Sequence, residues 1–142
     1  MTDRQKLVQH LVLDEGLRLK LYPDTLGVPT IGVGRNVRDK GLSSDEAFLL
    51  LDHDIDESVH DLTSFAWFPN LSAVRQRVIV NMRFNLGPIR FREFKTMIHC
   101  LAIGDIDGAA NEITNSLAAK QNMNRYNRLA RMMRTDFDEV NG

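Results

Sequence analysis

Apolar positions near the N-terminus follow the spacing of a helix and then the spacing of a strand. Four apolar residues share one helical face ahead of a glycine: Leu7, Val8, Leu11 and Val12. This spacing predicts a helix over residues 4–14, which Gly16 can end. From residue 17 to residue 21, leucines alternate with basic side chains, and Tyr22 follows. Alternation with a period of two predicts a half-buried strand there.

Turn-forming residues separate this strand from a second one. Residues 23–27 read Pro-Asp-Thr-Leu-Gly, a composition typical of a tight turn. Residues 28–33 are rich in β-forming side chains, and Gly32 and Gly34 allow close approach to the backbone. We therefore expect a β-hairpin, or two strands of a small sheet.

A capping box begins the next predicted helix. Ser43 is followed three residues later by Glu46, and apolar residues then recur at helical spacing as far as Val59. The opposite face is acidic and carries Asp45, Glu46, Asp52, Asp56, Glu57 and Asp61. We expect this helix to end near Leu62.

The rest of the chain predicts several more helices. Ser72 can cap a helix that begins at Ala73 and is apolar on more than one side, as is typical of a central, buried helix. Gly87 and Pro88 should end it. Further helices are expected at 91–102, 105–118 and 123–135. The order of one helix, a small sheet and several helices indicates an α+β fold.

Composition limits the classes of protein that fit this chain. Its 142 residues, 43% hydrophobic and 26% charged, suit a soluble globular protein of one domain or two small lobes. No apolar run is long enough to cross a membrane, and residues 1–16 lack the pattern of a signal peptide. Cys100 is alone, which excludes an intrachain disulfide. We therefore expect the chain to stay in the cytoplasm of the cell that makes it until something else releases it.

Charge is distributed unevenly. Residues 1–74 carry 7 basic and 12 acidic side chains, whereas residues 75–142 carry 11 basic and 7 acidic ones. The second half could face an anionic partner, or it could be an ordinary solvated helical surface. No aromatic platform or basic stripe accompanies the arginines, so nucleic-acid binding is not expected. The histidines lack a third ligand nearby in sequence, so no metal site is expected.

One stretch carries a specific resemblance. Residues 14–35, DEGLRLKLYPDTLGVPTIGVGR, closely resemble the catalytic stretch of the T-even phage lysozymes, the endolysins of glycoside hydrolase family 24. The family signature is a Glu, an Asp or Cys nine residues later, and a Thr six further on. Glu15, Asp24 and Thr30 match it. Weaker matches follow in the family's order at 72–75, 81–87, 91–94 and 127–135, so the resemblance spans most of residues 4–138.

The chemistry of glycosidic-bond cleavage accounts for this spacing. Cleavage needs a carboxylic acid that protonates the leaving oxygen, and a second group across the sugar ring that handles water or the developing cation. Glu15 at a helix end can be partly desolvated, which favours its neutral form, while Asp24 in a turn should be solvated and ionised. The hairpin would carry Asp24 out and Thr30 back, so that both stand across a cleft from Glu15.

The resemblance implies a role for each site residue. Glu15 would be the general acid, Asp24 the base or electrostatic partner of the attacking water, and Thr30 the residue that positions this water. Arg128 matches a family arginine that pairs with the catalytic Glu, although it could be a plain surface arginine. Phe84 matches an aromatic residue on the cleft floor that would contact substrate, although it could be plain core.

The resemblance also implies a lysozyme-like α+β architecture within a single domain. A small N-terminal lobe, about 12–45, would hold a short antiparallel sheet. A connecting helix, about 43–62, would lead to a larger helical lobe, about 63–142, to which the N-terminal helix 4–14 would also belong.

Several features depart from the family pattern. Arg35 stands where the family often has histidine, which argues against a structural His–Asp pair there. The usual "RTGxW" ending reads Arg134-Thr135-Asp136-Phe137, so the turn lacks its glycine and Phe137 would replace the aromatic plug. The link between the sheet and the capping-box helix is short, which predicts a smaller N-terminal lobe.

The function implied is that of an endolysin-type lysozyme. It would hydrolyse the β-1,4 bond between N-acetylmuramic acid and N-acetylglucosamine in peptidoglycan, with inversion, for host lysis by a phage or prophage. No cofactor, metal, nucleic acid or stable membrane association is implied, and a monomer is expected. The enzyme would collect in the host cytoplasm and reach the periplasm or wall after membrane permeabilisation. A lytic transglycosylase, a non-catalytic peptidoglycan-binding scaffold and a structural component of a phage tail are the alternatives.

Overall fold

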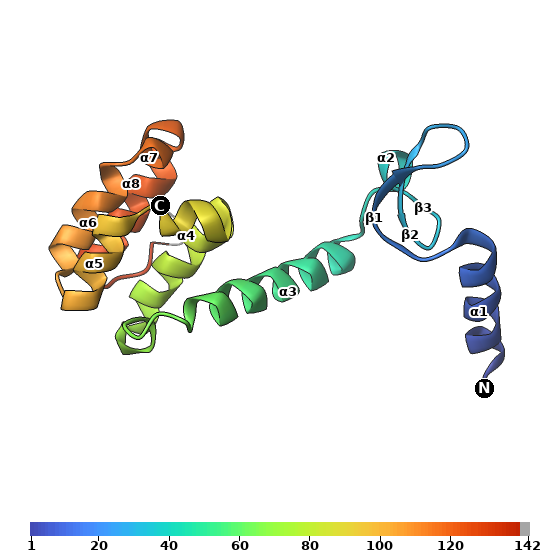
Figure 1. The fold of residues 1–142 in the computed structure, drawn as a ribbon, viewed down its shortest axis with the longest axis horizontal. Coiled ribbons are helices and arrows are strands. Elements are labelled where there is room, and N and C mark those ends of the chain that lie inside the picture. Colours follow the sequence, from blue (N-terminus) through green and yellow to red (C-terminus); the bar gives the residue numbers. More distant parts are fainter. Residues whose placement is uncertain (140–142) are drawn as a thin grey trace. The chain divides into compact units, whose positions relative to one another are not determined.

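The chain forms two compact units, an N-terminal unit of Met1–Leu50 and a C-terminal unit of Leu51–Gly142. The computed structural model describes residues 1–139 (Figure 1). Helices dominate, and one small antiparallel sheet lies in the N-terminal unit. This composition confirms the predicted α+β fold. No helix among residues 1–139 combines the length and apolarity needed to cross a bilayer.

The N-terminal unit begins with a helix and a three-stranded sheet. Its elements are α1 (Asp3–Glu15), β1 (Arg18–Pro23), β2 (Pro29–Gly32), β3 (Arg35–Asn36) and the single-turn helix α2 (Val37–Lys40). Thr2 and Gln5 cap the start of α1 reciprocally. Gly16, with φ of 80°, ends α1 where the sequence predicts an end.

The strands are antiparallel in the order β1-β2-β3. Arg18 pairs with Gly32 and Tyr22 with Thr30. A spacing of four residues along β1 is therefore matched by a spacing of two residues along β2, so the register is irregular. This irregularity bends β1, and the Arg18 guanidinium lies 4.3 Å from the centroid of the Tyr22 ring. The three leucines that predict a half-buried strand are instead exposed in β1 and just before it: Leu17, Leu19 and Leu21.

The sequence did not predict β3 or α2. Each is too short for a periodic pattern to show. The Asn36 side chain accepts a hydrogen bond from the Asp39 N–H at 3.0 Å and so caps α2. These elements fill the short link before the next helix.

The predicted capping box is confirmed at the start of α3 (Ser44–Leu62). The Ser43 N–H donates to Glu46 Oε1 at 2.9 Å, and the Glu46 N–H donates to Ser43 Oγ at 3.2 Å. The helix ends at Leu62, as the sequence predicts.

The C-terminal unit is helical. After α3 come η1 (Phe68–Asn70), α4 (Ala73–Arg92), α5 (Lys95–Ile103), α6 (Ile106–Thr114), α7 (Leu117–Gln121) and α8 (Met123–Thr135). Ser72 caps α4 as predicted. Val78, Ile79 and Met82 of α4 are fully buried, which confirms its central position.

Helix α4 changes direction at Gly87. The backbone of Gly87 has φ of 78° and ψ of 172°, a conformation open essentially only to glycine, and a second helical segment runs on from Pro88 to Arg92. The predicted end at Gly87 is therefore a kink between two segments. The predicted helix 105–118 likewise divides, because the Ser116 hydroxyl caps a new helix, α7.

A cluster of ion pairs joins α3 to both segments of α4. Asp61 Oδ2 accepts from Arg83 Nε at 2.6 Å, and Asp61 Oδ1 accepts from Arg92 Nη2 at 2.7 Å. Arg83 is buried, and the Arg92 guanidinium lies 5.1 Å from the centroid of the Phe65 ring. Hydrogen bonds from Arg92 first, and from Arg83, lower the pKa of Asp61 to about 2.

The turn after α8 forms without the family's glycine. Asp136 takes the left-handed conformation, with φ of 61°, which aspartate tolerates better than most residues. Its N–H donates to the Met132 carbonyl at 3.0 Å, and its carboxylate accepts from the Ser72 hydroxyl. Phe137 is 74% exposed, so the expected aromatic plug is not found.

Candidate functional site

Glu15 is the last residue of α1, and its side chain lies over the backbone of Gly34. A Cβ atom at position 34 would lie only 2.8 Å from Glu15 Oε2, so glycine leaves the space that this carboxylate occupies. Glu15 is exposed, so the N-terminal unit by itself does not provide the desolvation that the sequence suggests.

Asp24 is fixed by the turn that follows β1. Its Oδ1 accepts hydrogen bonds from the backbone N–H groups of Leu26 and Val28, both at 2.8 Å. The Gly27 N–H donates to the Asp24 carbonyl at 3.0 Å and closes the turn. Asp24 is exposed, as predicted, and its Oδ2 accepts no hydrogen bond within the N-terminal unit.

Thr30 is buried in the central strand β2, between Tyr22 of β1 and Asn36 of β3. Its Oγ1 donates to the Val28 carbonyl at 2.8 Å. The hydroxyl proton is thus engaged, and the lone pairs of Oγ1 remain to accept a hydrogen bond.

Val28 links the two hairpin residues. Its N–H binds the Asp24 carboxylate, while its carbonyl accepts from both the Thr30 hydroxyl and the Asp24 N–H, the latter at 2.9 Å. Asp24 and Thr30 are therefore both held by the backbone of Val28, and Glu15 reaches the turn between β2 and β3 at Gly34. The unit thus carries two carboxylates, one held by backbone N–H groups and one at a helix end.

Phe84 and Arg128 lie in the C-terminal unit. Phe84 of α4 is 43% exposed and lines an apolar hollow of about 660 Å³. The other lining residues come mainly from α3 and α4 and include Leu51, Ile55, Val59 and Val80. Arg128 of α8 is half-buried and does not line this hollow.

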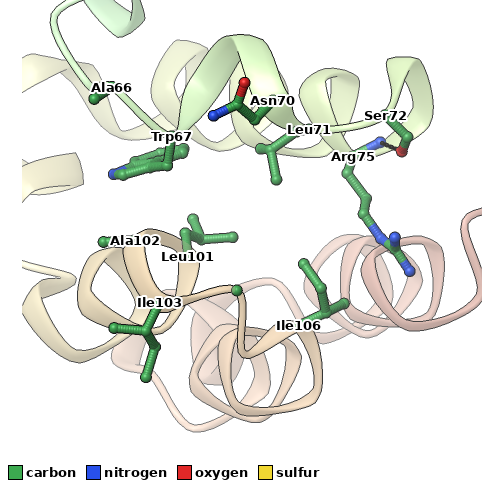
Figure 2. Close-up of a pocket in the computed structure, with 11 residues that line it drawn as sticks. Ala66, Trp67, Asn70, Leu71, Ser72, Arg75, Leu101, Ala102, Ile103 and Ile106 are labelled. Carbon is green, nitrogen blue, oxygen red and sulfur yellow. Dashed lines mark hydrogen bonds between the residues drawn. The ribbon is translucent and has the colours of Figure 1, made fainter.

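A second hollow of the C-terminal unit, of about 620 Å³, contains none of the predicted site residues. Figure 2 shows Trp67 and Leu71 on one wall, facing Leu101 and Ile106 on the other. No group of three or more His, Cys, Asp or Glu residues within 1–139 is arranged to hold a metal ion.

Comparison with known proteins shows to which family the chain belongs. The family model described as phage lysozyme matches residues 13–132, which include all five predicted site residues. The chain belongs to the phage lysozyme family. The resemblance found in residues 14–35 is thereby confirmed. Membership supports a muramidase-type lysozyme, a glycoside hydrolase whose substrate is peptidoglycan.

Individual relatives are similar at low identity. The pre-baseplate central spike protein Gp5 of Enterobacteria phage T4 is 30% identical over 158 residues, covering 91% of this chain but 28% of that protein. The chain therefore spans less than a third of the spike protein. Probable T4-type lysozymes 1 and 2 of Dictyostelium discoideum are 25% and 26% identical, each covering 88% of this chain and 91% of the relative.

The structure identifies two further candidate site residues, Asn81 and Arg125, which the sequence did not suggest. Arg125 Nε donates to Asn81 Oδ1 at 2.9 Å, and both residues line the hollow beside Phe84. Each lies one helical turn before a predicted site residue, Asn81 before Phe84 on α4 and Arg125 before Arg128 on α8, but their hydrogen bond joins positions 44 apart and leaves no local pattern in the sequence.

Arg35 has a structural contact in place of the family's His–Asp pair. Its Nη1 donates to Glu46 Oε1 at 2.9 Å and to the Gly41 carbonyl at 3.2 Å. The Ser43 N–H and hydroxyl, together with Arg35, hold the pKa of Glu46 below its ordinary value. Arg35 therefore ties β3 to the first turn of α3.

Proposed function

We propose that this member of the phage lysozyme family hydrolyses the β-1,4 bond between N-acetylmuramic acid and N-acetylglucosamine, with Glu15 as the general acid. The observation that supports the proposal is the arrangement around the sheet. Asp24 and Thr30 are both held by the Val28 peptide groups, and the Glu15 carboxylate lies over Gly34. Two carboxylates and a water-positioning hydroxyl are the groups that inverting hydrolysis needs.

Each residue has one step in this mechanism. Glu15 gives its proton to the glycosidic oxygen as the bond to the anomeric carbon breaks. Asp24 Oδ2 takes a proton from the water that attacks the opposite face, so the configuration inverts. The Thr30 hydroxyl donates its proton to the Val28 carbonyl. Thr30 Oγ1 can therefore accept a hydrogen bond from the attacking water, which orients a lone pair of the water towards the anomeric carbon.

The decisive experiment compares wild type with Glu15→Gln on outer-membrane-permeabilised bacterial cells. Glutamine keeps the shape of the side chain but has no proton to give, so clearing should slow by at least about 100-fold. Equal clearing by both proteins would place the acid elsewhere. Wall binding without turnover by either protein would instead support the non-catalytic scaffold.

Product analysis separates hydrolysis from the transglycosylase alternative. Hydrolysis adds one water to each cleaved bond, whereas a transglycosylase leaves a 1,6-anhydro sugar and adds none. The anomer formed first, followed by NMR, tests inversion. An initial β-anomer would contradict the role given to Asp24.

We also propose that Phe84 contacts the substrate and that Arg128 supports the acid. Arg125 is a second candidate for the supporting cation, because it lies beside Phe84 at the hollow. Arg125→Met and Arg128→Met form a matched pair. If Arg128 supports the acid, Arg128→Met should shift one limb of the pH–activity profile and Arg125→Met should leave the profile in place. The reverse result would assign the supporting role to Arg125.

Host lysis is proposed as the biological role. The enzyme would accumulate in the host cytoplasm and reach the wall after membrane permeabilisation. Cells that express it should remain intact until a membrane-permeabilising agent is added, and then lyse. Lysis on expression alone would contradict this sequence of events.

A further inference from the structure

The end of the Glu15 side chain rests on a stretch of backbone. Glu15 Oε2, Cδ and Cγ lie 2.8, 3.0 and 3.2 Å from the position of a Cβ atom added at Gly34. All three atoms therefore pack against Gly34, which lies in the short turn between β2 and β3. The position of this turn thus decides where the carboxylate stands.

Two glycines leave this turn little conformational preference of its own. Gly32 and Gly34 have φ of 69° and 64°. Glycine loses more conformational freedom on folding than any other residue, so a turn built on two of them is held mainly by its surroundings. The strand that follows, β3, comprises only Arg35–Asn36. Backbone pairing on that side of the turn is therefore short.

The side chain of Arg35, the residue after Gly34, provides a second hold. Its Nη1 donates to Glu46 Oε1 at 2.9 Å and to the Gly41 carbonyl at 3.2 Å, and its Nη2 forms an ion pair with Glu46 Oε2. A guanidinium that meets both oxygens of one carboxylate is fixed in direction as well as in distance. Arg35 thereby ties the turn to the beginning of α3.

Glu46 is held in turn by the capping box of α3. Its Oε1 accepts from the Ser43 N–H at 2.9 Å, and its N–H donates to Ser43 Oγ at 3.2 Å. The side chains of Arg35 and Glu46 are 28% and 37% exposed, so water screens their charges less than those of a fully exposed pair. A continuous series of contacts therefore runs from the start of α3 to the Glu15 carboxylate.

We propose that Arg35 and Glu46, the clamp pair, position the general acid by holding the Gly34 turn in place. The inference rests on the proposed function, in which Glu15 is that acid. A general acid must lie within hydrogen-bond reach of the leaving oxygen, and a misplacement of about 1 Å can slow a reaction by about 100-fold. Arg35 and Glu46 are thus positioning residues, and their loss should slow bond cleavage without weakening substrate binding.

A second ion pair of the N-terminal unit provides a matched control. Arg38 pairs with Asp39, its neighbour in sequence, at 3.3 Å. Both residues belong to α2, so the pair joins no two elements, and their side chains are 59% and 65% exposed. Arg38→Gln therefore removes the same charge as Arg35→Gln but leaves the clamp pair intact.

The test measures kcat and KM for the release of reducing ends from soluble peptidoglycan. Arg35→Gln and Glu46→Gln should each lower kcat about tenfold and leave KM unchanged, whereas Arg38→Gln should match wild type. Glutamine at position 46 can still accept from the Ser43 N–H, so the capping box is kept while the ion pair is lost. Urea unfolding at the assay temperature gives the folded fraction by which each kcat is corrected. If Arg35→Gln does not fold, Glu46→Gln decides the test.

A double-mutant cycle with Glu15→Gln shows whether the clamp pair acts through the acid. In the Glu15→Gln background, assayed at raised enzyme concentration, the clamp variants should cause no further loss, because no acidic proton remains to be placed. A merely structural role would lower the rate by the same factor in both backgrounds.

Three results would overturn the proposal. Equal factors in the two backgrounds would show that the clamp pair does not act through Glu15. An unchanged kcat for either clamp variant would show that the pair does not hold the turn. A loss in Arg38→Gln as large as that in Arg35→Gln would assign the effect to positive charge in general. The proposed function would fail in a different way, because Glu15→Gln would then be as active as wild type.

Discussion

The Glu15 carboxylate occupies the space in which a side chain at position 34 would stand. Alanine at Gly34 would place its Cβ 2.8 Å from Glu15 Oε2, and the φ of 64° would strain the backbone. The end of a glutamate side chain moves easily, so the collision should displace the carboxylate rather than unfold the sheet. We predict that Gly34→Ala loses most of its activity, while its free energy of unfolding falls by only about 1 kcal/mol.

Gly32→Ala is the matched control for this prediction. Gly32 has a φ of 69°, and no atom lies within 4 Å of the position of an added Cβ. Its backbone strain should therefore be similar, without the collision. Urea unfolding and cell-clearing rates measured on both variants separate the effects. Equal loss of activity in both would mean that strain in the sheet, not the position of Glu15, limits the enzyme.

Local sequence reveals some site residues and hides others. Glu15, Asp24 and Thr30 could be proposed because their spacing, from the end of α1 through the hairpin that follows, matches the signature of the phage lysozyme family. Hydrogen bonds between residues far apart in sequence leave no such pattern. The bond from Arg125 to Asn81 spans 44 positions, so it becomes visible only once α4 and α8 pack together.

At the scale of elements, caps were the most reliable signals. Ser43 and Ser72 mark helix starts through hydrogen bonds within four residues, so the sequence alone predicts them. The alternation of residues 17–21 predicted burial wrongly, because neither face of β1 packs on a hydrophobic core within the N-terminal unit. No local pattern could show this, since burial of a strand face depends on the elements that pack against it.

Gly87 allows α4 to change direction, and this makes it the most demanding glycine of the C-terminal unit. Its φ of 78° and ψ of 172° are nearly closed to other residues, so Gly87→Ala should destabilise the protein by about 1–3 kcal/mol. Gly104→Ala is the control, because its ψ of 16° lies in the left-handed helical region, which other residues can enter. Thermal unfolding should show a smaller loss for Gly104→Ala. The opposite order would contradict the strain assigned to the kink.

The ion pairs of Asp61 make stability depend on acid pH. The pKa of Asp61 is lowered from 3.8 to about 2, so the folded state favours the carboxylate over the acid. This stabilisation, about 2 kcal/mol, is fully present above the unfolded pKa near 4 and is lost as the pH falls through 2.

Asp61→Asn isolates this effect. It should lower the free energy of unfolding at pH 7 by about 2 kcal/mol and leave it nearly unchanged near pH 2. Chemical denaturation between pH 2 and pH 7 measures the difference. Curves for wild type and variant that stay parallel over this range would show that Asp61 does not carry the pH dependence.

At the scale of the whole molecule, burial is very unequal between the two units. Val28 and Thr30 are the only buried residues of the N-terminal unit. The contiguous hydrophobic core, from Leu62 to Met133, lies entirely in the C-terminal unit. The short link before α3 predicted a small N-terminal lobe, but sequence patterns could not show how little of it is buried, because apolar residues are spread over both units.

This inequality predicts how fragments of the chain behave. A fragment of residues 43–142 keeps the capping box of α3, the Asp61 cluster and the whole core, so it should fold alone and unfold cooperatively. A fragment of residues 1–42 has too little buried apolar surface to offset its conformational entropy and should be largely unfolded. Far-UV circular dichroism with thermal scans measures both.

A cooperative transition in residues 1–42 would mean that backbone pairing and turns such as that of Asp24 stabilise the catalytic hairpin without a core. A non-cooperative 43–142 fragment would mean that the core requires residues 1–42.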